Sequence, residues 1–342
     1  MISSIIALIF LSTTPSPSVG GLNSIGAIAP ADTIKVSEWL VPWSHTRPRD
    51  PFVAPDGRVW FCGQAGGYVG VLDPETGAFN RYDLGSGAGP HNLIVDADGF
   101  VWYAGNRRAH IGRLDPESGD IEKFPMPDGV NDPHTLVFDG LGGIWFTVQF
   151  SNYVGHLNIE SGEVRVVEMP VTRSRPYGIK MDSKGNPWVV LFGTNKLATV
   201  NPETMELTTF DLEREDARPR RLEITSDDKI WYSDYAQGYL GRFDPETLAF
   251  REWPLPEGKR ARPYGMAVDS EDRIWIVEGG ISPNQFIGFD SRSGEFIEST
   301  SIPSGGGTVR HMYFHEPENT IWFGTDTNYI GKAILPVRKP KL

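Results

Sequence analysis

The stretch GPHNLIVDADGFVWYAG, residues 89–105, has a near copy at residues 132–148, DPHTLVFDGLGGIWFTV. Both stretches begin with Pro-His after one residue, run through apolar residues into a glycine-containing turn, and reach an apolar residue followed by Trp. The second copy begins 43 residues after the first. Self-similarity at a period of about 20–50 residues is typical of solenoids and propellers, so the copy indicates a repeated structural unit.

The proline of this motif defines a register that recurs along the whole chain. The proline occurs at Pro48, Pro90, Pro133, Pro176, Pro219 and Pro263, and Arg310 takes its place in the last copy. These positions are 42, 43, 43, 43, 44 and 47 residues apart. A tryptophan follows each of them after twelve residues: Trp60, Trp102, Trp145, Trp188, Trp231, Trp275 and Trp322. Seven of the ten tryptophans therefore share one position, which identifies seven copies of one unit.

Each unit reads as four short strands. In the second copy, LIVDADG runs into a turn, FVWYAG alternates β-forming residues, HIGRLDPESG ends in a Pro- and Gly-containing turn, and IEKFPMP stops at prolines. Such segments are typical of strands, and no window shows a sustained helical period. The sequence therefore predicts an all-β fold, a seven-bladed β-propeller with four antiparallel strands per blade.

The two ends of the chain predict how the ring closes. The seventh unit contains only three strand-like segments, whereas residues 32–42, DTIKVSEWLVP, resemble a fourth strand that has no unit of its own. We expect this N-terminal strand to complete the last blade, which removes an exposed sheet edge. The propeller is then one domain, residues 31–342. Residues 1–30 contain the short apolar run IIALIFL and are predicted to be a signal peptide or a disordered segment.

Composition narrows the class of partner. The formal net charge of −12 argues against nucleic acid as a ligand, because such proteins carry basic surfaces. The single cysteine, Cys62, rules out an intrachain disulfide. No segment is long and apolar enough to span a membrane.

With the predicted signal peptide, we expect an exported, periplasmic or secreted monomer that binds a small molecule.

Equivalent positions of a propeller lie on a circle around its axis, so the residue after each register position is expected at one mouth of the central channel. These residues are Arg49, His91, His134, Tyr177, Arg220, Tyr264 and His311. The residues before the register position are Arg47, Gly89, Asp132, Arg175, Arg218, Arg262 and Val309. The composition of this circle is unlike that of the acidic protein as a whole, because it gathers six Arg, three His and two Tyr around one carboxylate.

A cationic mouth of this kind favours an ester- or carboxylate-bearing ligand. We predict that Arg49, Arg175, Arg218, Arg220, Arg262 and Tyr264 bind substrate. The alternative is that these arginines pair with Asp and Glu of neighbouring loops, as charged residues on exposed loops commonly do.

The units PHTLVFDGLGGIWFTVQFSNYVGHLNIESGEVRVVEMP and RPYGIKMDSKGNPWVV resemble the virginiamycin B lyase, or streptogramin lyase, family over about residues 32–335. The resemblance implies an enzyme that opens a cyclic depsipeptide by elimination across its ester, without water. It also implies a Mg²⁺ ion held by carboxylates and a histidine that acts as acid or base.

The blades of this chain can be aligned with those of the family in two ways. Aligned end to end, the catalytic histidine falls on His311, but Val309 and Tyr264 replace a metal-binding Glu and a second His, and only Asp326 could supply the other carboxylate. In a rotated register, His91, Asp132, His134 and Tyr177 come from three consecutive blades, and Gln149 or Val148 takes the second carboxylate position.

The rotated register keeps more functional groups together, so it is preferred. It implies that His134 is the acid or base, that His91 and Tyr177 orient the substrate carbonyl, and that Asp132 and Gln149 hold Mg²⁺. Two rival functions are a gluconolactonase-like lactone hydrolase and a non-catalytic module that binds an anionic ligand or a peptide.

Overall fold

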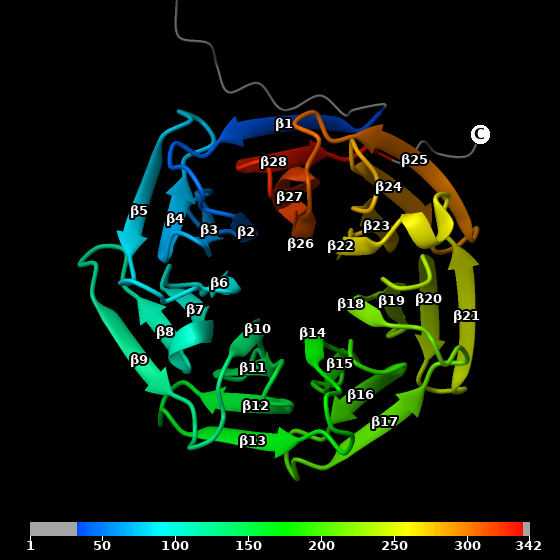
Figure 1. Ribbon diagram of the computed structural model, residues 1–342, viewed down its shortest axis with the longest axis horizontal. Coiled ribbons are helices and arrows are strands. Elements are labelled where there is room, and N and C mark those ends of the chain that lie inside the picture. The colour runs from blue at the N-terminus through cyan, green and yellow to red at the C-terminus, as the bar shows by residue number, and fades with distance from the viewer. Residues whose placement is uncertain (1–32, 338–342) are drawn as a thin grey trace, which may run out of the picture. The chain divides into compact units, whose positions relative to one another are not determined.

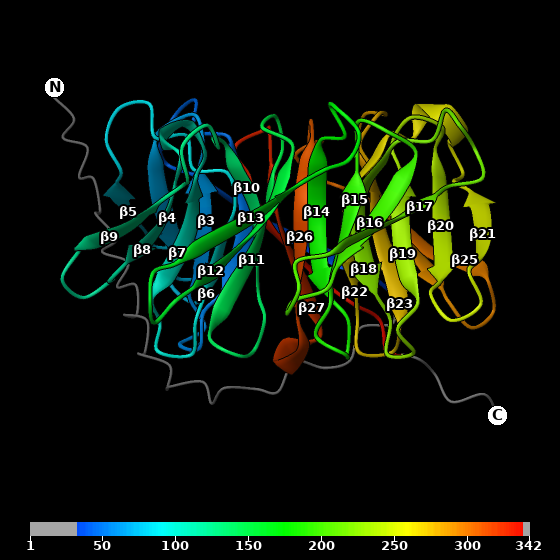
Figure 2. The same cartoon turned by 90° about the horizontal axis from the view of Figure 1, so that it is seen from below.

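The computed structural model describes residues 33–337. Their 28 strands form seven four-stranded antiparallel sheets around a central axis, with the first strand of each blade innermost (Figure 1). Seen edge-on, the connecting loops gather at the two faces of the ring (Figure 2). The predicted seven-bladed β-propeller is therefore confirmed. The predicted signal peptide or disordered segment, residues 1–30, lies outside the described residues.

The first three blades are built from consecutive strands, which follow one another from the channel outward. Blade 1 contains β2 (Pro48–Val53), β3 (Val59–Gly63), β4 (Tyr68–Leu72) and β5 (Phe79–Asp83). Blade 2 contains β6 (Leu93–Val95), β7 (Val101–Gly105), β8 (His110–Leu114) and β9 (Ile121–Pro125). Blade 3 contains β10 (Pro133–Phe138), β11 (Gly143–Val148), β12 (Tyr153–Asn158) and β13 (Val164–Glu168).

The next three blades continue the same order. Blade 4 contains β14 (Pro176–Met181), β15 (Pro187–Leu191), β16 (Lys196–Val200) and β17 (Leu207–Asp211). Blade 5 contains β18 (Pro219–Ile224), β19 (Ile230–Asp234), β20 (Tyr239–Asp244) and β21 (Ala249–Pro254). Blade 6 contains β22 (Pro263–Val268), β23 (Arg273–Glu278), β24 (Gln285–Asp290) and β25 (Glu295–Ser301).

Blade 7 joins the two ends of the chain, as the sequence predicts. It contains β26 (Val309–His315), β27 (Thr320–Thr325), β28 (Tyr329–Ile334) and, outermost, the N-terminal strand β1 (Lys35–Leu40). Strand β1 pairs antiparallel with β28 from Lys35–Ile334 to Leu40–Tyr329. Three short 3-10 helices, η1 (Asn106–Arg108), η2 (Gly258–Arg260) and η3 (Glu316–Glu318), lie in loops.

The repeated tryptophans fill the space between blades. All seven are buried, and each packs with apolar residues of its own blade and the next, as Trp102 does with Leu136 and Phe146. Their indole nitrogens are also satisfied in several blades. Trp102, Trp188 and Trp275 each donate to the carboxylate of an aspartate six residues earlier, at 2.8–3.0 Å. In these three blades, the aspartate that opens the turn therefore also anchors the blade core.

This anchor gives a stability prediction. Asp96 accepts from the Trp102 indole at 2.8 Å and from the backbone N–H of Phe100 at 2.9 Å. We expect Asp96→Ala to lower the free energy of unfolding by about 1–3 kcal/mol, because it leaves a buried donor without a partner. Asp98→Ala, at an exposed residue of the same turn, is the matched control. Equal urea midpoints for the two variants would contradict this role.

Candidate functional site

The inner strands deliver their first residues to one mouth of the channel. In six blades the pairing of the inner strand with its neighbour is irregular at this point, for example between Pro133 and Leu136 and between Pro176 and Ile179. A bulge leaves the extra residues out of the hydrogen-bonded ladder and redirects their side chains. In blades 3, 4 and 6 the two residues after the register proline are therefore released from strand pairing, whereas Arg49 in blade 1 and Arg221 in blade 5 remain paired with Cys62 and Ser233.

Aromatic and imidazole rings from four blades form a continuous row at this mouth. The ring centroids of His91 and His134 are 3.5 Å apart, and those of His134 and Tyr177 are 4.1 Å apart. The hydroxyl of Tyr177 is hydrogen-bonded to that of Tyr264 across the channel. Arg49 from blade 1 extends the row, because its Nη1 lies 3.0 Å from Nε2 of His91.

The guanidinium of Arg220 is stacked among aromatic rings of the same mouth. It lies 3.5 Å from the ring centroid of Tyr264, 4.4 Å from that of Tyr235, 4.7 Å from that of Phe192 and 5.2 Å from that of Tyr177. A cation held over ring faces is attracted by their quadrupoles. This contact holds Arg220 in place without a carboxylate partner.

Arg221 and Asp50 connect the inner strands of several blades. Arg221 reaches three other blades: Nε donates to the carbonyl of Arg310 at 3.1 Å, Nη1 donates to Thr135 Oγ1 at 3.2 Å, and Nη2 lies 3.5 Å from Asp50 Oδ2. Asp50 is fully buried and also accepts from Arg49 Nε and Asn92 Nδ2, both at 3.0 Å. Burial opposes ionisation of Asp50, but Arg49 and Arg221 outweigh it and hold its pKa well below the ordinary value.

The contacts of the two buried histidines constrain their protonation. Arginine can only donate, so Nε2 of His91 accepts from Arg49 and the ring proton of neutral His91 lies on Nδ1. Nδ1 of His134 lies 2.8 Å from Thr135 Oγ1, the hydroxyl that also accepts from Arg221. Burial, together with nearby guanidiniums, lowers the pKa of His91, His134 and His311 well below the ordinary value, so all three are neutral at pH 7.

Several polar atoms of this cluster are buried without a hydrogen-bond partner. They are Nη2 of Arg49, Nδ1 of His91, Nε2 of His134, Nε of Arg220, Nη2 of Arg221 and Nδ1 of His311. Buried polar groups are normally hydrogen-bonded, and exceptions cluster where a ligand or a reaction requires them. Because these atoms come from blades 1, 2, 3, 5 and 7 and belong to one mouth, we take this cluster as the candidate site.

The structure divides the circle of predicted residues into two groups. Arg49, His91, His134, Tyr177, Arg220, Tyr264 and His311 come together at the mouth. The residues before the register position do not join them. Arg175 and Arg262 are exposed and have left-handed backbone, and Arg218 donates from Nη1 to carbonyls of its own loop. Their predicted role in substrate binding therefore has no support from contacts within the cluster.

The predicted Mg²⁺ ligands do not form a metal site. The carboxylate of Asp132 accepts from the backbone N–H of Phe150 at 2.7 Å and from the backbone and hydroxyl of Ser151 at 3.1 and 3.0 Å, so it ties its own loop to the loop between β11 and β12. Gln149 is half-buried and brings only a neutral amide. Within residues 33–337, no group of three or more His, Cys, Asp or Glu is placed to hold a metal.

The carboxylate that the end-to-end register offers is also engaged. Asp326 is bonded to both terminal nitrogens of Arg310 and lies 3.8 Å from Arg47 Nε. A carboxylate flanked by two arginines is a poor ligand for a cation. The donor set present therefore does not fit Mg²⁺ in either register, and we derive no step through such an ion.

Sequence reasoning missed the two residues that tie the site together, Asp50 and Arg221. The repeat could have indicated them, because both lie two residues after a register proline. Other blades carry uncharged residues at this position, such as Asn92, Thr135 and Gly178, so the two charged residues stand out. Tyr235 and Phe192, which cover Arg220, follow β19 and β15 and carried no recognisable pattern.

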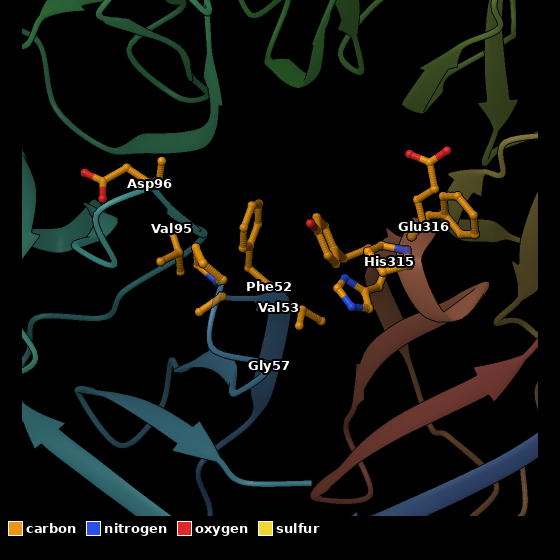
Figure 3. Close-up of a pocket in the computed structure, with 13 residues that line it drawn as sticks. Phe52, Val53, Gly57, Val95, Asp96, His315 and Glu316 are labelled. Atoms are coloured by element: carbon orange, nitrogen blue, oxygen red, sulfur yellow. The ribbon is translucent and has the colours of Figure 1, made fainter. Parts of the chain in front are cut away.

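A separate cavity of about 640 Å³ lies at the opposite end of the inner strands, lined by residues that include Phe52, Asp96, His315 and Glu316 (Figure 3). Two of its lining residues, Ala54 and Glu316, lie six residues before Trp60 and Trp322, where three other blades carry a tryptophan-binding aspartate. The histidines and arginines of the candidate site begin the inner strands, whereas these residues end them, so this cavity is not part of that site.

The fold and the cluster define a class: a seven-bladed β-propeller whose candidate site is assembled from several blades at one mouth of the channel. The chain belongs to the virginiamycin B lyase family, whose model matches residues 19–280 and 163–335. Among curated protein sequences none matches this chain.

Solved structures show the same fold. Virginiamycin B lyase from Staphylococcus aureus superposes with a TM-score of 0.80 at 24% identity, covering 88% of this chain and 99% of the other. A streptogramin B lyase gives 0.79 at 22% identity, covering 88% and 97%. Hydrazine synthase from Kuenenia stuttgartiensis gives 0.73 at only 11% identity, covering 87% and 98%, which shows how widely this propeller is used.

Proposed function

We propose that this chain is a carbon–oxygen lyase that opens a cyclic ester or depsipeptide by elimination at the mouth that holds His91 and His134. The unpartnered, buried Nε2 of His134 carries the proposal, because an acid or base must present a free nitrogen to the substrate. Membership of the lyase family supports it. So does a catalytically inactive form of the Staphylococcus aureus enzyme that was solved with quinupristin, a ligand of that protein.

The hydrogen bond at the other nitrogen of His134 supports both roles. When Nδ1–H donates to Thr135 Oγ1, the lone pair of Nε2 is free to take a proton; when the hydroxyl donates instead, Nε2 carries a proton to give. In the elimination, His134 would take the proton from the carbon next to the carbonyl. A carbon–carbon double bond forms, the bond to the ester oxygen breaks, and a carboxylate leaves.

The arginines would stabilise the charge that this step creates. Negative charge develops first on the carbonyl oxygen and then on the leaving carboxylate, and preorganised donors in a water-poor site stabilise both. Arg49 Nη2, His91 Nδ1 and Arg220 Nε are unpartnered groups of this kind. In the proposed step they provide electrostatic stabilisation at these oxygens.

The proposed function is tested by ring opening. Purified protein incubated with a streptogramin B antibiotic and a panel of macrocyclic lactones, with and without EDTA, is analysed by liquid chromatography and mass spectrometry. Elimination gives a product of unchanged mass and new retention time, whereas a lactone hydrolase adds one water. We expect His134→Gln to lower kcat/KM by at least about 100-fold, because general acid–base catalysis typically contributes that much.

His156→Gln is the matched control, because His156 pairs with Asp139 on the outer part of blade 3, away from the mouth. Loss of turnover in His311→Gln but not in His134→Gln would move the acid or base to blade 7 and overturn the assignment. Absence of turnover on every ester would overturn the lyase.

One observation favours a second candidate, a non-catalytic module that binds an anionic small molecule. Arg49, His91 and Arg220 all present buried nitrogen atoms that have no hydrogen-bond partner in the described part of the chain. A binding module needs no base, so it predicts saturable binding of a carboxylate without turnover.

A further inference from the structure

The candidate site holds more positive than negative charge. Arg49 and Arg221 are buried, and Arg220 is largely covered by aromatic rings, whereas Asp50 is the carboxylate that the structure pairs with this group. Glu223, farther along β18, is paired with Lys180 at 2.8 Å. Buried charges are strongly unfavourable unless they are compensated, so three guanidiniums against one carboxylate require a further negative charge.

The hydrogen-bonded pair of Tyr177 and Tyr264 is the nearest group that can supply it. Both rings are buried, and their hydroxyls meet each other. Arg220 and Arg221 both lie within 5.7 Å of both ring centroids. The titratable or charged groups that face the pair from the surrounding elements are Arg49 of β2, His134 of β10, Arg220 and Arg221 of β18, and Tyr235 after β19.

The electrostatics of the pair agree with this arrangement. Burial opposes ionisation of Tyr177, but Arg220, Arg49 and Arg221 outweigh it and lower its pKa. Burial and the neighbouring charge of Tyr177 raise the pKa of Tyr264. The two hydroxyls therefore lose one proton between them, and the remaining proton stays in their hydrogen bond.

We propose that this mouth binds a carboxylate against Arg49, His91 and Arg220, and that a shared negative charge on Tyr177 and Tyr264 compensates the guanidiniums when the ligand is absent, so that carboxylate binding and loss of the tyrosine proton compete. The carboxylate brings one negative charge, and the tyrosinate takes one proton from solvent, so the charge of the site is unchanged. Carboxylate affinity then falls as pH rises through the ionisation of the pair.

This inference deepens the proposed function, because a carboxylate is the group that elimination from an ester releases. It concerns binding at the same site and requires no turnover. A protein that binds carboxylate with proton uptake but opens no ester would sustain the inference and overturn the lyase. A protein that opens esters but binds carboxylate without proton uptake would do the reverse.

Acetate is the probe, with acetamide as its neutral counterpart. Calorimetric titrations between pH 6.5 and pH 9.5, in two buffers of different ionisation enthalpy without carboxylates, count the protons taken up. We expect uptake that approaches one proton per acetate above the ionisation of the pair, and affinity that falls there by about tenfold per pH unit. Tyrosinate absorbance near 295 nm should decrease when acetate is added at high pH, and acetamide should leave it unchanged.

Two single variants assign the effect to the pair. Tyr177→Phe removes the hydroxyl whose pKa the guanidiniums lower, so acetate binding should lose its proton uptake, and the acetate-sensitive absorbance should disappear. Tyr264→Phe removes only the shared hydrogen bond, so the proton uptake and the absorbance change should persist but shift to higher pH. Tyr82→Phe is the matched control, because Tyr82 lies on the outer strand β5 and donates to the carbonyl of Pro116. Two results with the wild-type protein alone would overturn the proposal. One is saturable acetate binding without proton uptake, and the other is the absence of saturable binding.

Discussion

Replacing Asp50 with asparagine is expected to lower the free energy of unfolding by about 3–5 kcal/mol, because it leaves buried arginines without their carboxylate partner. The carboxylate is fully buried and accepts from Arg49 Nε and from Asn92 Nδ2, both at 3.0 Å. Asparagine keeps the size of the side chain and tolerates the left-handed backbone of this residue, φ 49°. The variant therefore removes the charge and leaves the local shape intact.

Urea unfolding at pH 7.5 measures this loss. The matched control is Asp56→Asn, because Asp56 pairs with Arg58 on the surface and exposed pairs contribute at most about 1 kcal/mol. The double variant Asp50→Asn with Arg221→Met removes an opposite charge together with the carboxylate. We expect it to be more stable than the sum of the single losses predicts. Additive losses would show that the two groups are not coupled across the channel.

Acidification should destabilise the protein between about pH 6.5 and pH 5. His91 and His134 are buried, and burial lowers their pKa well below the ordinary value, so the folded state keeps them neutral where the unfolded state binds protons. The stability is therefore fully present above the unfolded pKa of about 6.5 and is lost as pH falls below it. Two such groups together contribute about 2–3 kcal/mol per pH unit.

The partly exposed His311 adds to this loss, reduced by its contact with water. Below about pH 5, buried carboxyls whose pKa is raised by burial, Glu223 and Glu278, oppose the effect, which limits the window. Urea midpoints at pH 7.5, 6.5, 5.75 and 5 measure the slope. His134→Gln should lower the slope by about 1.4 kcal/mol per pH unit, the contribution of one such group. If the urea midpoint of the wild-type protein did not change with pH, water or protons would reach these rings in the folded state, and the prediction would be wrong.

Several parts of the fold were readable from the sequence because they repeat. A tryptophan twelve residues after each register position can recur only if each copy packs in the same way, so spacing alone predicted seven blades. The missing fourth strand of the last unit and the unassigned residues 32–42 predicted closure by β1, which pairs with β28. The spacing also placed His91, His134, Tyr177 and His311 near one mouth.

The contacts within that mouth were not readable in the same way. Asp132 and His134 are two residues apart, yet one braces a loop through Phe150 and Ser151 while the other lies in the buried row of rings. A periodic register cannot distinguish them, because the direction of each side chain depends on the left-handed backbone of Asp132 and on the bulge in β10. The predicted Mg²⁺ ligands depended on that difference.

The sequence by itself determined the number of blades, their strand order and the positions that converge on the axis, because these follow from local β-pattern and period. Only the tertiary structure decided which charges meet. Arg221 contacts Asp50 and Thr135 across the channel, and neither residue is near it in sequence. Electrostatic interactions depend on distances of a few ångströms between side chains and on their burial, and those distances exist only after the ring has closed.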